Sequence, residues 1–225
     1  MDFVELEKRL LALAEKGQAQ PMKAYMKNNF EFLGVRSPDR RKAAKQFFKD
    51  FKTPELDWDF VEACWDQPYR EFQYVAIDYL VAHKKNLVLA DLPRLKKLAQ
   101  TKFWWDSIDG FDKLVGKIVL DNPEAKQVMV DWSLDEDFWL RRIAIDHQLL
   151  QKEKTDIVLL EKILVNNLNQ TEFLSLKRLV GVCVIIRRLI LIGFETFWEN
   201  TNIKWQVYRF VKQVSIYRLN DDKSI

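Results

Sequence analysis

Apolar positions recur at a spacing close to 3.6 residues along most of the first 170 residues, which predicts a succession of amphipathic helices. Gly17 follows the first segment as a helix stop, and Pro21 begins the next segment at its first helical position. Ser37-Pro38 marks a further helix start. No pair of strands is predicted. We expect helices over residues 3–16, from 21, from 37, and over 57–66, 70–83, 92–100, 107–121, 123–134, 138–151 and 156–167.

The composition favours the same fold class. Only 6 glycines and 6 prolines occur among 225 residues, fewer than a β-sandwich or barrel with many tight turns usually contains. Hydrophobic residues make up 48% of the chain and charged residues 31%, which excludes a disordered tail. We therefore predict one all-α domain over residues 1–225.

A short internal repeat indicates how these helices are organised. Ala76-Ile-Asp and Ala144-Ile-Asp are 68 residues apart, which is two units of 34, and Gly110 lies midway between them. Small residues at helix crossings with such a period are typical of a right-handed solenoid of helical hairpins, of the HEAT-like kind. The same spacing can also arise by coincidence in a helical bundle.

Charge and cysteine usage exclude several other classes. The two cysteines, Cys64 and Cys183, cannot build a disulfide framework and suit a reducing cytoplasm. A formal net charge of +3 permits binding to a polyanion without requiring it. No secretory signal is evident, and the longest apolar stretch, residues 179–194, is interrupted by arginines and shorter than the roughly 20 residues that a bilayer span needs. We expect no membrane association.

Familiar cofactor chemistry is disfavoured. The sequence contains no glycine-rich phosphate loop, no nucleophile elbow and no Cys-His pair. His83 and His147 have no cysteine or histidine at ligand spacing, so we expect no metal site and interpret both as solvent-facing or helix-capping residues.

The segment Trp104-Trp105-Asp106-Ser107-Ile108-Asp109 is the first candidate for chemistry. Asp106 and Ser107 favour a helix start, and Trp105 and Asp109 are four residues apart, so they can share one face in the first turn. A carboxylate beside an indole suits a cationic guest. The alternative is that the tryptophan packs in the core while the acid complements the helix dipole.

Arg141 and Arg142 form a second candidate. They stand near a predicted helix start, where the helix dipole favours anions rather than cations. That placement indicates an external anion or a carboxylate partner, with either arginine as a phosphate clamp. The alternative is a solvated pair beside the acidic segment 135–137.

In four blocks the sequence resembles the DNA alkylation repair glycosylases of the AlkD type, which are built from HEAT-like repeats. The resemblance extends from residue 1 to about residue 173, and its most specific part is the Trp-Trp-Asp-Ser-Ile-Asp segment. The blocks are PMKAYMKNNFEFLGVRSPDRR from Pro21, WDQPYREFQ from Trp65, TKFWWDSID from Thr101 and WLRRIAI from Trp139.

The resemblance implies the hydrolytic release of cationic N3- and N7-alkylated purines from double-stranded DNA. Asp109 resembles the family's catalytic carboxylate, Trp105 the residue that flanks the lesion sugar, and Arg142 the arginine that holds the site and the DNA backbone. The implied DNA contacts are Tyr25, Lys27, Arg36, Trp104 and Arg141; at Arg36 a relative has glutamine.

The family leaves the damaged base stacked in the duplex, and the resemblance therefore implies a monofunctional glycosylase that does not flip its base and needs no imine-forming lysine. We expect a monomer that uses no cofactor. Proteins of this fold without the carboxylate also exist, and Asp109 is present here. The alternatives are a non-catalytic helical-repeat module that binds DNA or a protein, and a scaffold that binds no nucleic acid.

The resemblance ends abruptly after Thr171-Glu172-Phe173, and residues 174–225 depart from the family pattern. Leu176-Lys-Arg-Leu-Val-Gly181 can be encoded by cta-aag-cga-ttg-gtt-ggg, and the same letters read two nucleotides later spell Lys-Ala-Ile-Gly-Trp, which is the family's continuation. Our hypothesis is that the residues from about Leu174 onward are translated out of frame.

Resequencing the gene tests this hypothesis. We expect an insertion or deletion near the codon of Leu174 whose correction restores a tryptophan near Val180. A nucleotide sequence that is incompatible with the offset reading would rule the frameshift out.

Overall fold

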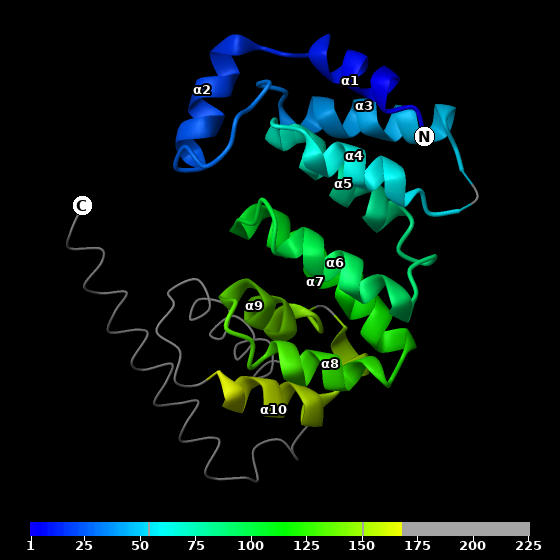
Figure 1. Cartoon of the computed structure of the whole chain (residues 1–225), viewed down its shortest axis with the longest axis vertical. Coiled ribbons are helices and arrows are strands. Elements are labelled where there is room, and N and C mark those ends of the chain that lie inside the picture. Colours follow the sequence, from blue (N-terminus) through cyan, green and yellow to red (C-terminus); the bar gives the residue numbers. More distant parts are fainter. Residues whose placement is uncertain (54, 150, 168–225) are drawn as a thin grey trace, which may run out of the picture. The chain divides into compact units, whose positions relative to one another are not determined.

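The computed structural model describes residues 1–53, 55–149 and 151–167, and over these the chain is all-helical (Figure 1). Two short 3₁₀ turns, Leu89–Asp91 and Lys152–Lys154, join longer helices. In the described part of the chain the only β-type pairing is an isolated bridge between Glu31 and Tyr69. The α-helices are α1 (Phe3–Leu11), α2 (Lys16–Tyr25), α3 (Ser37–Asp50), α4 (Trp58–Asp66), α5 (Arg70–Ala82), α6 (Leu92–Ala99), α7 (Trp105–Asp121), α8 (Ala125–Trp132), α9 (Phe138–Asp146) and α10 (Ile157–Asn166).

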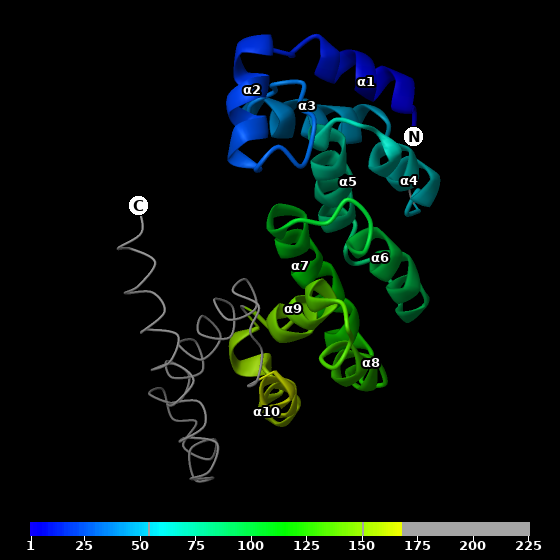
Figure 2. The same ribbon diagram turned by 60° about the vertical axis from the view of Figure 1, so that its left-hand side comes forward.

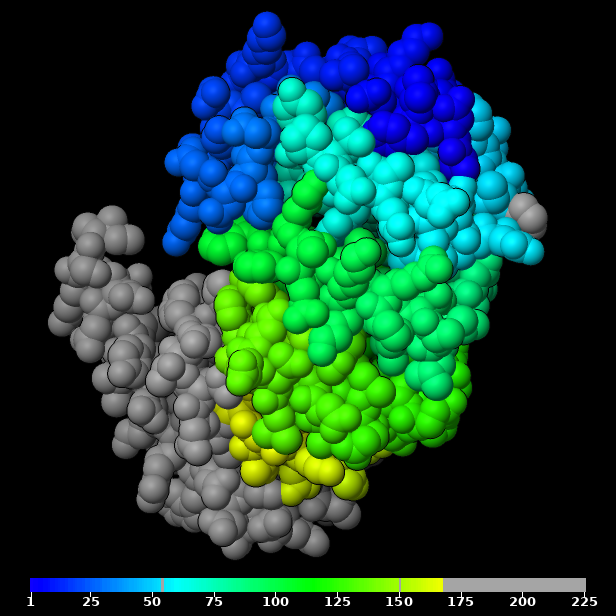
Figure 3. Space-filling model, viewed as in Figure 1, coloured from blue at the N-terminus to red at the C-terminus, as the bar shows by residue number. Residues whose placement is uncertain are grey.

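The chain divides into two compact units, Met1–Val88 and Leu89–Ile225. In the first unit α4 packs on α5, α3 packs on α5, and α1 packs on both α3 and α4 (Figures 1 and 2). Aromatic rings fill the space between these helices: the ring centroids of Phe47 and Phe60 are 5.6 Å apart, and those of Phe60 and Tyr79 are 5.1 Å apart. In the space-filling view α2 stands at the margin of this unit (Figure 3).

In the second unit each helix packs on its successor, and most also pack on a helix two or three places further along the chain. α6 packs on α7, α7 on α8 and α9, and α8 on α9 and α10. This nearest-neighbour stacking characterises helical repeats and confirms the predicted all-α, helical-repeat fold class. Ala76, Gly110 and Ala144 fall in α5, α7 and α9, and both alanines are fully buried. The prediction of one domain over 1–225 stays a prediction, and the proposed frameshift lies outside the described residues.

The N-terminal helices differ from the expectation. α1 ends at Leu11 rather than near residue 16, and α2 runs through Gly17 and contains Pro21 in its interior. The predicted stop and restart were therefore wrong. A helical Pro21 lacks the N–H that would bond the carbonyl of Gly17, so α2 loses one hydrogen bond. The start of α2 is fixed by packing instead, because a Cβ at Gly34 would lie 2.1 Å from the Glu15 carbonyl oxygen.

The segment that follows α2 is held by a buried carboxylate. Glu71 on α5 is fully buried and accepts hydrogen bonds from the backbone N–H groups of Leu33, Gly34 and Val35 at 2.9–3.1 Å. Three amide donors replace the water that a carboxylate loses on burial. Gly34 has a φ of +89°, a left-handed backbone conformation that residues other than glycine rarely adopt. The segment is therefore fixed although it contains no helix or strand.

Packing between α7 and α9 leaves no room for a side chain at Gly116. A Cβ at this position would lie 1.9 Å from the carbonyl oxygen of His147.

Both histidines are C-cap residues. His147 caps α9 and His83 caps α5, which confirms the capping interpretation for both. His147 is buried, and its Nδ1 lies 2.6 Å from the Ala144 carbonyl oxygen, so Nδ1 carries the proton.

Burial lowers the pKa of His147 from 6.5 to about 4. In the unfolded chain His147 therefore binds a proton near pH 6.5, whereas in the folded chain it binds one only near pH 4. We expect the free energy of unfolding to be highest above pH 6.5 and to fall by up to about 3 kcal/mol as the pH drops to 4. Urea unfolding followed by circular dichroism at several pH values measures this loss.

The substitution His147→Asn should flatten that dependence, because an amide can donate to the Ala144 carbonyl but does not titrate. His83→Asn serves as the matched control, since His83 also caps a helix through its Nδ1 but is only half-buried. An unchanged slope in the His147→Asn variant would contradict the assignment.

Candidate functional site

The start of α7 carries the Trp-Trp-Asp segment. α7 begins at Trp105, and Ser107 fixes its first turn by donating its hydroxyl to the Trp104 carbonyl at 3.0 Å and accepting the Trp104 N–H at 3.3 Å. Asp109 is the fifth residue of the helix, slightly further along than the predicted first turn. Trp105 and Asp109 are both partly exposed, and their spacing of four residues places them on one helix face.

The start of α9 brings two arginines to different partners. Asp137 caps the helix by accepting the Trp139 N–H at 2.9 Å. Arg141 is buried, and its Nη1 donates to the backbone carbonyls of Asp135 and Glu136 at 2.7 and 2.9 Å. Arg141 thus closes the turn before α9, and its predicted DNA contact stays a prediction.

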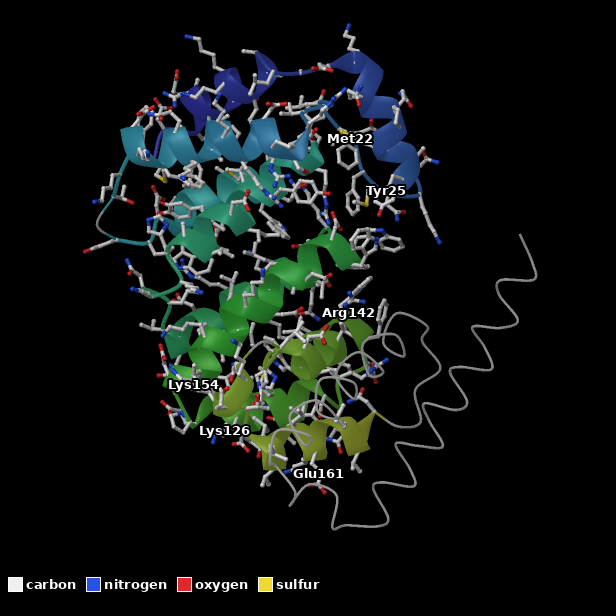
Figure 4. The ribbon with its side chains drawn as sticks, turned by 180° about the vertical axis from the view of Figure 1, so that it is seen from behind. Met22, Tyr25, Lys126, Arg142, Lys154 and Glu161 are labelled. Carbon is white, nitrogen blue, oxygen red and sulfur yellow. The ribbon has the colours of Figure 1, made fainter. Side chains whose placement is uncertain are left out.

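Arg142 forms an ion pair with Asp109. Its Nη2 lies 2.5 Å from Asp109 Oδ1, and this contact joins α9 to α7 across 33 residues of sequence. The Arg142 side chain is 5% exposed, whereas that of Asp109 is 35% exposed. The structure therefore brings two of the three predicted catalytic residues together, with the arginine inside and the carboxylate at the surface. Figure 4 shows Arg142 extending from α9.

Trp139 lies at the centre of an aromatic cluster beneath this pair. Its ring centroid is 5.9 Å from that of Phe103, 6.0 Å from that of Trp104 and 4.2 Å from that of Phe138. The guanidinium carbon of Arg142 lies 5.9 Å from the Trp139 ring centroid, within the range of a cation–π contact. The ring contact between Trp104 and Trp139 and the ion pair both link α7 to α9.

Trp104 therefore contributes mainly to packing. Its indole Nε1 is buried and has no hydrogen-bond partner among the described residues. The sequence interpretation assigned it a DNA contact, which stays a prediction, and it overlooked Trp139 and Phe103. Phe103 carries a readable signal, since a phenylalanine directly before the two tryptophans stands in a short polar connection. Trp139 carries no sequence signal that points to the site, because a tryptophan in a helix is usually a core residue.

The other predicted DNA contacts lie in the first unit. Tyr25 is the last residue of α2 and is 71% exposed; it extends from the helix end in Figure 4. Lys27 is exposed and has a φ of +54°, and Asn28 follows with +60°, so the backbone turns sharply after Tyr25. Arg36 is the exposed N-cap residue of α3.

The described residues contain no group of three or more His, Cys, Asp or Glu side chains that could hold a metal ion. Nor is any helix among them both long and apolar enough to cross a bilayer. The arrangement at α7 and α9 is instead an oriented carboxylate at a surface, with an arginine behind it and an indole on the same face. Such a carboxylate can stabilise positive charge on a neighbouring molecule.

Comparison with known proteins gives one family. The model of a family described as DNA alkylation repair enzyme matches residues 6–177 of this chain. A solved structure described as a predicted DNA alkylation repair enzyme from Enterococcus faecalis is 29% identical in sequence, with a TM-score of 0.69 and coverage of 89% of each chain. No protein of curated function matches.

A double-mutant cycle on Asp109→Asn and Arg142→Met measures the strength of the ion pair. We expect a coupling free energy of about 1–2 kcal/mol, because the arginine is buried while the carboxylate remains partly hydrated. Lys117 and Asp121, an exposed pair on the same helix, provide the control, for which we expect about 0.3 kcal/mol. Equal coupling in the two pairs would show that Arg142 gains nothing from burial.

Proposed function

Since the chain belongs to the DNA alkylation repair enzyme family, we propose that it is a monofunctional DNA glycosylase that acts on cationic N3- and N7-alkylated purines in double-stranded DNA. The observation that carries this proposal is the Asp109 carboxylate, partly exposed at the surface and held by Arg142 Nη2 at 2.5 Å. A carboxylate that only complemented the helix dipole would need no buried arginine behind it.

The chemistry of the substrate explains the need for a fixed carboxylate. An alkylated purine already carries a positive charge, so its bond to C1′ breaks with the electron pair leaving on the base. The deoxyribose then becomes oxocarbenium-like, as in glycoside hydrolysis. A carboxylate placed beforehand stabilises that charge without reorganising at the moment of reaction. Water adds to C1′ and loses a proton, which leaves a free base and an abasic site.

Each site residue then has a distinct role. Asp109 faces the developing positive charge and accepts a hydrogen bond from the attacking water. Arg142 orients the Asp109 carboxylate and, in this proposal, also holds the DNA backbone beside the site. Trp105 lies on the same face of α7 as Asp109 and flanks the lesion sugar. The base stays stacked, so the site needs no deep pocket of the kind that base-flipping enzymes use.

Exposed residues of the first unit supply DNA contacts in this proposal. Tyr25, Lys27 and Arg36 are all exposed, and the two cations neutralise phosphates while the tyrosine contacts the backbone or a groove. We propose that the protein acts as a monomer in the cytoplasm and needs no cofactor. Binding should weaken as salt rises, because neutralised phosphates release counterions.

Base release from randomly methylated duplex DNA tests the proposal. We expect the wild-type protein to free methylpurines, which mass spectrometry quantifies, and Asp109→Asn to lower the rate by about 100-fold. Asp106→Asn is the matched control, because this residue also lies at the start of α7 and its loss removes the same helix-dipole interaction. It should retain activity.

DNA affinity and melting temperature are recorded for each variant, so that lost folding is not mistaken for lost chemistry. Full activity in Asp109→Asn would contradict the assigned role of the carboxylate. A folded wild-type protein that binds DNA but releases no base would favour the alternative, a helical-repeat DNA-binding module, and one that binds no DNA would favour a protein-interaction module.

A further inference from the structure

Helix α3 of the first unit presents a row of cations to solvent. Four exposed basic side chains, which we call the α3 stripe, lie on it: Arg41, Lys42, Lys45 and Lys49. Successive helical residues differ by about 100° in direction, so the four side chains fall within an arc of about 100°. The buried residues of this helix lie on the opposite side: Arg40, Ala44 and Phe47.

The charge of the α3 stripe is not neutralised within the protein. The two acids of α3, Asp39 and Asp50, lie outside the arc, and Asp50 accepts a hydrogen bond from Arg9 Nη1 at 2.7 Å. Other lysines of the chain do pair, for example Lys126 with Asp156 at 2.7 Å. Within the ranges that the structure describes, none of the four stripe cations forms an ion pair.

The helix holds these like charges close together against their repulsion. Lys45 is four residues from both Arg41 and Lys49, and like charges at this spacing destabilise a helix. Packing of the opposite face keeps α3 in place, because the ring centroid of Phe47 lies 4.9 Å from that of Phe51 and 5.6 Å from that of Phe60. A fixed row of uncompensated cations attracts polyanions.

The spacing of the cations suits the backbone of duplex DNA. Arg41, Lys45 and Lys49 follow one another at intervals of about 6 Å along the helix axis, so the α3 stripe is about 12 Å long. A duplex carries a phosphate about every 3.4 Å of its axis on each strand, so this length faces about three or four phosphates. Arg36, to which the proposed function assigns a phosphate contact, is the N-cap of the same helix.

We propose that the α3 stripe lies along the phosphate backbone of duplex DNA and supplies affinity that does not depend on sequence or damage. Lysine and arginine contacts to phosphates position a protein on DNA without reading the bases. They release counterions, so they hold the duplex loosely enough for the protein to move along it. The bases remain stacked in this mode of binding.

This inference rests on the proposed glycosylase function and adds a search step to it. A repair enzyme meets intact base pairs far more often than damaged ones, so it benefits from affinity for undamaged duplex. The α3 stripe belongs to the first unit, whereas the Asp109 carboxylate belongs to the second. We therefore assign the search for lesions to α3 and the cleavage of the glycosidic bond to α7 and α9.

The salt dependence of binding to undamaged duplex DNA, measured by fluorescence anisotropy, tests the inference. The double variant Lys42→Gln/Lys45→Gln should reduce the slope of log K against log salt by about 1.8, because each phosphate contact contributes about 0.9. Between about 50 and 200 mM salt, the wild type should then lose roughly tenfold more affinity than the variant. The melting temperature should not fall, since the substitutions relieve repulsion between like charges.

Lys84→Gln/Lys85→Gln is the matched control, because these lysines are exposed just after α5 in the same unit and their replacement removes the same net charge. It should keep the wild-type slope. An unreduced slope in the Lys42→Gln/Lys45→Gln variant, or an equal reduction in the control, overturns the inference. So does an unreduced slope accompanied by lost retention on immobilised polyglutamate, which would assign the stripe to an acidic protein.

Release of methylpurines by the wild-type protein is measured in parallel. If bases are released while the double variant keeps the wild-type slope, only the role of the α3 stripe is wrong. If the slope falls as expected but the wild type releases no base, the stripe binds DNA and the glycosylase proposal fails.

Discussion

The close approach of α7 and α9 is the constraint on which the candidate site depends. Gly116 permits it, because a methyl group there would collide with the His147 carbonyl. The ion pair depends on this spacing, because the guanidinium of Arg142 reaches Asp109 Oδ1 at 2.5 Å only while α7 and α9 stay close together. The chemistry at one end of the helix pair is thus set by packing near the other.

The two neighbouring arginines show how similar residues divide their roles. Successive helical positions differ by about 100° in direction, so Arg141 turns toward the backbone carbonyls before α9 while Arg142 turns toward α7. One closes a turn and the other orients a carboxylate. Both are buried, so their charges must be satisfied by nearby acceptors, and each finds them on a different side of the helix.

Most of the helices could be predicted from the sequence, because helical periodicity and family motifs are local signals. The helix carrying Asp109 was predicted within two residues of its bounds, and the helix carrying Arg142 was predicted at its start but ends at Asp146, five residues before the predicted end. The course of α2 was not, because its position depends on Gly34, which is distant in sequence. Trp139 was missed for a similar reason. Its contacts come from a separate connection, and no spacing rule links residues 103 and 139.

The Glu71 carboxylate has a consequence for the motions of the first unit. It accepts three successive amide hydrogens from a segment without helix or strand. Those amides can exchange with deuterated water only when α5 and the segment separate, so this irregular stretch shares the opening equilibrium of a buried helix. A loop that secondary structure alone would rank among the most mobile is, on the timescale of hydrogen exchange, part of the rigid core.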